Sequence, residues 1–462
     1  MLLLIEKYLF YLFLFSIPFQ TRKILYYDGW RFNEWQSISI YTTDILLLIL
    51  LGFWAINFLK SYKLQVTSYK LQKSDLFLIA FLAISAVSIK NSSNPIISWF
   101  QWLKLVEFVV FYWYLSRYAF AKFGLFNSFL TIMMGGLFQA VTAIIQLIKQ
   151  SSIGLRYLGE SVINGDLSGI ASFYLPTGEK IIRAYGTMPH PNVLAAFLLL
   201  ALFAFYFVYL YSRLFGEARP EGAARLHSEH SALADTWDKT MLVFYGIILF
   251  AFFATFSRVA VFIWFVSFCF RSVIVRAFKR YRIIFGTKEG RKRIIAILLV
   301  SLCVIVLFGS LYFEEIFSRF TIDKEDQSVE LRAFYLKEAF KAGEGINLLG
   351  VGIGNFVGWL IEQHPYLPYY VYQPVHNIYL LMYSETGILG LSAFIMFLTF
   401  LIKDFIKRTR FRKAYHLSGL VLLGSFLFIG FFDHFFWTLQ QGRFVFWLGL
   451  GVLTYFSSND IM

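Results

Sequence analysis

The chain alternates long apolar runs with short polar segments. A helix needs about 20 apolar residues to cross a bilayer, and runs of roughly this length recur throughout the sequence. We interpret twelve runs as membrane spans, at about 2–20, 41–59, 76–89, 97–115, 125–148, 192–212, 241–256, 259–275, 294–312, 376–402, 415–432 and 444–458. The pattern therefore predicts an all-α polytopic membrane protein in which 1–462 form a single integral membrane domain.

Two segments between the predicted spans are much longer than the others, at 149–191 and 313–375. In the first, ASFYLPTGEKIIRAYG indicates two short strands around a Pro-Thr-Gly turn. In the second, SVELRAFYLKEAFKAGE has helical periodicity, with Leu331, Phe334, Tyr335 and Ala339 on its apolar stripe. We expect this helix to lie at the membrane surface, partly over the mouth of the bundle.

Composition supports the membrane prediction, and charge orients the chain. The residues are 58% hydrophobic and 15% charged, whereas a soluble domain is about a quarter charged. The net charge of +14 does not indicate nucleic-acid binding, because Lys and Arg gather in short loops beside apolar runs. The densest clusters, RAFKRYRIIFGTKEGRKR and KDFIKRTRFRK, are cytoplasmic when the N-terminus is inside, which makes both long loops extracytoplasmic.

In this topology three side chains border apolar spans at the extracytoplasmic side, namely Arg183, Arg258 and His376. Charged groups at membrane depth are expensive and usually serve a site, so these three are candidates for one shared cavity. A guanidinium offers paired donors that suit phosphate, and an imidazole can take a proton from a hydroxyl near neutral pH. Taken singly, however, an arginine at this depth is more often an interfacial anchor and a histidine more often structural. Spacing alone therefore leaves the function open.

The stretch HNIYLLMYSETGILG carries a more specific pattern. His376 and Asn377 are followed by nine residues and then by Gly387 and Gly390, in the order His-Asn, nine residues, Gly-x-x-Gly. This pattern resembles a signature of the O-antigen ligase family, which includes O-antigen polymerases and bacterial protein O-oligosaccharyltransferases.

Other stretches resemble the same family in order and spacing. RAYGTMPHPNVLAAFL begins at Arg183 and contains Asn192, and TFSRVAVF contains Arg258. Arg332 precedes LLGVGIGNF, and FDHFFWTLQQGRFVFW follows near the end of the chain. The O-antigen-ligase-like core extends over about 180–450.

The resemblance implies a GT-C-like fold and an inverting, metal-independent glycosyltransferase without a cofactor. The donor would be a glycan on undecaprenyl diphosphate, and the acceptor a hydroxyl of a glycan, lipid or protein. The enzyme would serve lipopolysaccharide or polysaccharide biosynthesis in the cell envelope, from the cytoplasmic (inner) membrane with its active site on the extracytoplasmic face. The matching residues are His376 as the base, Arg183, Arg258 and Arg332 at the donor diphosphate, and Asn377, Asn192, Gly387 and Gly390 in support.

Several alternatives remain open. A ligase would use a lipid-anchored core sugar, a polymerase another lipid-linked repeat, and a protein O-oligosaccharyltransferase a Ser or Thr hydroxyl. From a different class, a transporter or flippase for polyprenyl-linked glycans would spread its polar groups along a two-sided pathway. If a divalent cation were needed, the carboxylates of Asp323, Glu325 and Asp326 would be the first suspects. His434 is a weaker candidate base than His376.

Two further features have structural interpretations. Glu385 lies deep in the run after His376 and is expected to make a hydrogen bond between helices. The glycines of GVGIGN, from Gly350 to Asn355, predict a tight bend in which backbone approaches backbone.

Overall fold

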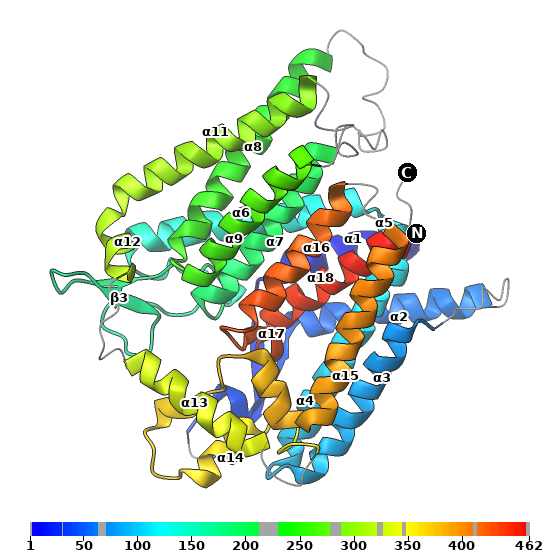
Figure 1. Cartoon of the computed structure of the whole chain (residues 1–462), viewed down its shortest axis with the longest axis vertical. Helices are drawn as coiled ribbons and strands as arrows, with labels where there is room; N and C mark the ends of the chain where they lie inside the picture. The colour runs from blue at the N-terminus through cyan, green and yellow to red at the C-terminus, as the bar shows by residue number, and fades with distance from the viewer. Residues whose placement is uncertain are drawn as a thin grey trace.

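The computed structural model describes residues 2–29, 31–62, 71–211, 230–277, 288–320, 327–343, 348–409 and 414–458. Within them, long helices form a bundle, and shorter elements gather near β3, α13 and α14 (Figure 1). The long helices are α1 (Leu2–Ser16), α2 (Thr42–Tyr62), α3 (Lys73–Ser88), α4 (Pro95–Tyr114), α6 (Leu125–Lys149), α7 (Pro191–Tyr211), α8 (His230–Ala254), α9 (Arg258–Ala277), α11 (Lys288–Leu311), α15 (Ile378–Thr409), α16 (Ala414–Ile429) and α18 (Gln440–Ser458).

The structure confirms the predicted class, a helical multi-pass membrane protein. In the described part of the chain, seven are long and apolar enough to cross a membrane, at Lys73–Asn91, Pro95–Phe123, Leu125–Lys149, Pro191–Leu210, Asp235–Ala254, Gly290–Leu311 and Ile378–Thr409. Shorter apolar helices lie at Thr42–Asn57, Arg258–Cys269 and Tyr415–Ile429. A helix occupies each of the twelve predicted runs, but the number of membrane crossings stays a prediction.

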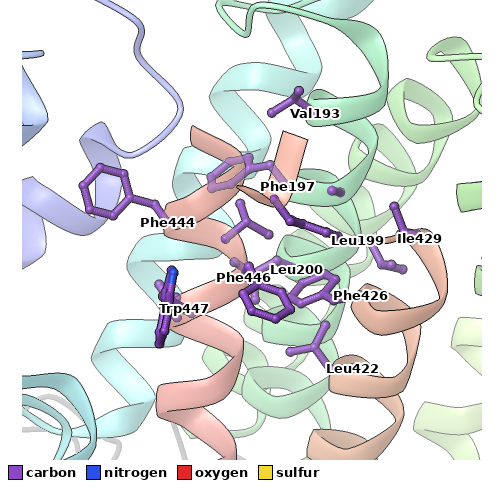
Figure 2. Close-up of a cluster of buried hydrophobic side chains, with 14 of the residues drawn as sticks. Val193, Phe197, Leu199, Leu200, Leu422, Phe426, Ile429, Phe444, Phe446 and Trp447 are labelled. Atoms are coloured by element: carbon purple, nitrogen blue, oxygen red, sulfur yellow. The ribbon is translucent and has the colours of Figure 1, made fainter. Parts of the chain in front are cut away.

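Helix α7 forms the centre of the bundle. In its span 94% of the apolar window is buried, against 22% for the span in α11, which therefore lies at the periphery. Figure 2 shows Phe197 and Leu200 of α7 beside Phe426 of α16 and Phe446 of α18. Because lipid tails are as apolar as these side chains, close packing rather than exclusion of water holds such helices together.

Short strands lie in the loops. The hairpin of β3 (Ser172–Tyr174) and β4 (Lys180–Ile182) is antiparallel, which confirms the two strands predicted around the Pro-Thr-Gly turn. A second antiparallel pair, β1 (Arg22–Tyr27) and β2 (Ser37–Tyr41), was not predicted. Its register shifts between Ile24 and Tyr26, so the alternation that marks a strand in a sequence is interrupted there.

The segment before α15 folds into three helices, α12 (Phe313–Phe320), α13 (Gln327–Gly343) and α14 (Phe356–Gln363). Helix α13 confirms the predicted helix, because Tyr335 and Ala339 of its apolar stripe are buried. It packs against α15, and the Tyr335 hydroxyl donates a hydrogen bond to the carbonyl oxygen of Val371 at 2.7 Å. The long loop is thereby fixed to the start of α15, where His376 lies.

Helix α15 is broken at Gly387, whose φ of 68° and ψ of −174° lie outside the helical region. The break lets the loop at 348–352 join the helix backbone, with Val351 N donating to Ser384 O at 2.9 Å and Gly352 N donating to Glu385 O at 3.0 Å. Non-helical backbone at membrane depth is tolerated when such protein partners satisfy it. The bend predicted at Gly350 is therefore confirmed, since Gly350 has a φ of 68° and packs against the backbone of α15.

Replacing Gly387 by alanine is expected to destabilise the protein by about 2 kcal/mol or more, because a Cβ there would collide with the Leu348 carbonyl group and the φ is left-handed. The measurement is thermal unfolding in detergent. Gly309→Ala in α11 is the matched control, since a Cβ at Gly309 meets nothing within 4 Å. Equal melting temperatures for the two variants would contradict this account of the break.

Candidate active site

Residues far apart in the sequence meet near the starts of α7, α9 and α15. Arg183 follows β4, Asn192 is the second residue of α7, and Arg258 is the first residue of α9. His376 lies two residues before α15, and Asp433 lies in the turn between α16 and α17 (Phe435–Thr438). The predicted convergence of His376, Arg183 and Arg258 depends on how these helix starts pack.

All three predicted arginines line one pocket. We call it the arginine pocket, and its lining includes Arg183, Arg258, Arg332, Asn192 and Asp433. The charged groups among its lining residues are three guanidiniums and one carboxylate, so the pocket carries an excess of positive charge. The low-dielectric walls of a pocket strengthen the electric field of the charges that line it. The arginine pocket is therefore suited to a multiply charged anion.

Arg183 is held by a chain of hydrogen bonds. Its Nε donates to the carbonyl oxygen of Thr255 at 2.7 Å, and its Nη2 donates to Oδ1 of Asn192 at 2.7 Å. The amide of Asn192 in turn donates from Nδ2 to Oδ2 of Asp433 at 2.7 Å. Asn192 therefore links the arginine to the carboxylate and fixes the orientation of the buried guanidinium, whereas the sequence assigned it only an unspecified supporting part.

Arg258 owes its position to a tight turn between α8 and α9. Phe256 in this turn has a left-handed φ of 46°, which is rare for a bulky residue, and its ring packs at 5.0 Å on Phe173 of β3. The turn places Arg258 at the N-terminus of α9, so the positive end of the helix dipole and the guanidinium face the same pocket. The arginine side chain itself is exposed.

Arg332 reaches the pocket from the long loop. It is an exposed residue of α13, and it completes the lining opposite residues of α7, α9 and the turn at Asp433. Because α13 packs against α15, the arginine is placed by the same contact that covers His376. The resemblance named Arg332 together with Arg183 and Arg258, and the structure brings all three to one pocket.

His376 lies beside the arginine pocket rather than in its lining. Its ring stacks on Tyr335 with centroids 6.0 Å apart and meets His434 edge-on at 5.0 Å. Its buried Nδ1 has no hydrogen-bond partner among the described residues. Burial lowers the pKa of His376, Asp433 opposes this shift, and the positive charge of Arg332 adds to it. The ring is therefore neutral at physiological pH, which is the form that can accept a proton.

Asp433 is the residue of this centre whose part the sequence did not reveal. Burial raises the pKa of Asp433, but the interactions with His434, His376 and His190 and the hydrogen bond from Asn192 together outweigh that effect and hold it below its ordinary value. Burial lowers the pKa of both His434 and His190 to about 3. A neutral cluster of imidazoles thus surrounds one carboxylate. Sequence gave no signal for it beyond the pair Asp433–His434 near the end of a span.

The other predicted supporting residues shape α15. Oδ1 of Asn377 accepts hydrogen bonds from the N–H groups of Tyr379 and Leu380 at 2.9 and 3.0 Å, as a helix N-cap does. Gly387 makes the break in α15, and Gly390 leaves room for the side chain of Thr386. The two glycines lie farther along the helix and do not line the arginine pocket.

These features define a multi-pass membrane protein with an arginine-lined pocket at one end of its bundle. Residues 243–395 match the family model described as O-Antigen ligase, so the chain contains an O-antigen ligase domain, as its motifs predicted. The match includes Arg258, Arg332 and His376. Arg183 and Asp433, which line the arginine pocket with Arg258 and Arg332, lie outside the matched residues. This domain supports an O-antigen ligase- or polymerase-type membrane glycosyltransferase. No curated protein matches it.

Proposed function

We propose that this protein transfers a glycan from undecaprenyl diphosphate to an acceptor hydroxyl at the extracytoplasmic face of the cytoplasmic membrane. The observation that carries the proposal is the convergence of Arg183, Arg258 and Arg332 on one pocket next to His376. A diphosphate is the anion that three guanidiniums suit, because each offers paired donors to phosphate oxygens. The membrane supplies such a diphosphate in the form of a lipid carrier.

In the proposed reaction, His376 takes the proton of the acceptor hydroxyl while that oxygen attacks the anomeric carbon of the donor sugar. The bond from this carbon to the diphosphate oxygen breaks, and the diphosphate leaves with the electron pair. A single displacement of this kind inverts the anomeric configuration. The arginines stabilise the charge that develops on the leaving group, and Asn192 holds Arg183 in place for it.

The proposed reaction is metal-independent, because the guanidiniums occupy the place where a divalent cation would otherwise neutralise a diphosphate. The carboxylates named as metal-ligand suspects, Asp323, Glu325 and Asp326, lie outside the described residues. Transfer is expected to persist at its full rate in EDTA. Loss of transfer in EDTA that magnesium restores would contradict the metal-free mechanism.

The direct test supplies the purified protein with an undecaprenyl-diphosphate-linked glycan and identifies by mass the molecule that gains the sugar. A core glycolipid as the product indicates a ligase, a lengthened lipid-linked glycan a polymerase, and a glycosylated peptide a protein O-oligosaccharyltransferase. Movement of the intact donor between leaflets without cleavage of the sugar–phosphate bond would instead indicate a flippase and overturn the proposal.

As the pH falls, the transfer rate is expected to drop only below the ordinary histidine pKa of 6.5. The reason is that burial lowers the pKa of His376 and keeps this base neutral in mild acid. Asp433→Asn removes a charge that raises this pKa, so the drop in rate moves to lower pH. Arg332→Gln removes a charge that lowers it, so the drop in rate moves to higher pH. The measurement is kcat/KM as a function of pH, and shifts in the same direction for both variants would contradict the assignment.

A further inference from the structure

A second pocket lies on the other side of the segment 433–438. We call it the tryptophan pocket, and its lining includes Trp35, Trp437, Glu34, Gln101, Glu385 and Arg443. The two pockets share this segment as a wall: Asp433 and Phe435 line the arginine pocket, whereas Phe436, Trp437 and Thr438 line the tryptophan pocket. The two cavities are therefore neighbours with different linings.

The histidine pair lies at this wall. His434 contacts the His376 ring at 5.0 Å on one side and the Trp35 ring at 5.0 Å on the other, and its Nδ1 is 2.7 Å from Oγ1 of Thr438. Pro374, two residues before His376, also lines the tryptophan pocket. His376 lines neither pocket, but Pro374 and the ring of His434 connect it to the tryptophan pocket.

The polar side chains of the tryptophan pocket are held in place by one another. Arg443 donates from Nε to the carbonyl oxygen of Trp437 at 2.6 Å and from Nη2 to Oε1 of Gln101 at 2.7 Å. The indole N–H of Trp437 donates to Oε2 of Glu385 at 2.8 Å, which confirms the hydrogen bond predicted for that carboxylate. Because Arg443 occupies the amide oxygen of Gln101, that amide can offer its NH₂ group to a ligand.

The two pockets differ in the charge of the side chains that line them. The charged side chains that line the tryptophan pocket are two carboxylates, Glu34 and Glu385, and one guanidinium, Arg443. Three guanidiniums and one carboxylate line the arginine pocket. A diphosphate is therefore directed to the arginine pocket. Indole faces together with preorganised carboxylate and amide groups suit a neutral ligand that has both C–H faces and hydroxyl groups, which describes a sugar.

We propose that the tryptophan pocket binds the acceptor glycan, as neutral sugar rings, and presents a hydroxyl to His376 past the ring of His434. This proposal rests on the proposed function, since it gives the acceptor of that reaction its own subsite. Donor and acceptor then enter from opposite sides of the histidine pair. The lining of the tryptophan pocket includes Pro374, which precedes α15, and Glu385, which lies inside that helix.

The binding test uses two probes, inorganic pyrophosphate and a panel of neutral oligosaccharides of two to four residues, with the full-length protein in detergent. Gln101→Leu is expected to weaken glycan binding about tenfold, as the loss of a well-made hydrogen bond does, and to leave pyrophosphate binding unchanged. Glu34→Gln is a milder change at a half-buried carboxylate in the 3₁₀ helix Glu34–Gln36, where Glu34 pairs with Arg22 at 2.6 Å, and it is expected to weaken glycan binding about threefold. Arg258→Gln is expected to weaken the binding of pyrophosphate and to leave glycan binding unchanged.

The kinetic test is carried out with the acceptor found by mass. Gln101→Leu and Glu34→Gln should raise the KM for that acceptor by the factors seen in binding and leave the KM for the donor unchanged. A general loss of structure would change both constants together. Absence of glycan binding by every member of the panel, or equal weakening of both probes by Gln101→Leu, would overturn the acceptor subsite. Failure of the wild-type protein to bind pyrophosphate or cleave the donor would instead overturn the proposed function.

Discussion

Replacing His376 by alanine is expected to lower the rate of glycan transfer by about 10²–10⁴-fold, the range that a positioned general base contributes. The protein should remain folded in the membrane, because the aromatic contacts of the ring among the described residues are those with Tyr335 and His434, and its Nδ1 bonds to no described group. The measurement is the initial rate of transfer with purified protein at matched concentration, together with thermal unfolding in detergent.

Two other histidines serve as controls for this experiment. His364→Ala removes a ring that bonds to Glu338 at 3.0 Å and lies outside both pockets, so transfer should stay within about threefold of wild type. His434→Gln removes a ring whose Nδ1 is already engaged by Thr438, and its effect should be smaller than that of His376→Ala. Undiminished transfer by His376→Ala, or a larger loss in His434→Gln, would remove His376 from the role of base.

Elements with a clear local pattern were predictable from the sequence. The apolar runs predicted where helices form, the stripe through Tyr335 and Ala339 predicted α13, and the Pro-Thr-Gly turn predicted β3 and β4. Each of these depends on periodicity or on turn chemistry over a few residues. The same holds for Glu385, whose depth in a span predicted its hydrogen bond with another helix.

Features made by tertiary contacts were not predictable. Asn192 and Asp433 are separated by 241 positions, and no periodicity connects them, so the hydrogen bond between them appears only in the fold. Gly387 was noticed as part of a motif, but its left-handed φ and the docking of the loop at 348–352 depend on a neighbour that sequence does not reveal. The segment 433–438 was seen as one aromatic stretch, whereas Asp433 and Phe435 line one pocket and 436–438 line another pocket of different charge.

Arg258→Lys is expected to lower transfer by about 10²-fold, although the positive charge is kept, because a lysine cannot offer the paired planar donors of a guanidinium. Arg258 is a sharper test of the anion site than Arg183. Arg183 is buried and bonded to Asn192 and Thr255, so its replacement disturbs packing, whereas Arg258 is exposed and its backbone is set by the turn at Phe256. Arg31→Lys is the matched control, since that arginine stacks on Tyr369 outside the pocket.

The two kinetic constants separate the ways in which Arg258 can act. If the guanidinium binds the diphosphate equally in the ground state and the transition state, Arg258→Lys raises the donor KM and leaves kcat unchanged. If it stabilises the charge that develops as the sugar–phosphate bond breaks, kcat falls, and this is the expected result. Arg258→Gln should then be slower than Arg258→Lys, because it loses the charge as well as the paired donors. Near-normal constants for both variants would make Arg258 an interfacial anchor and leave Arg183 and Arg332 to hold the diphosphate.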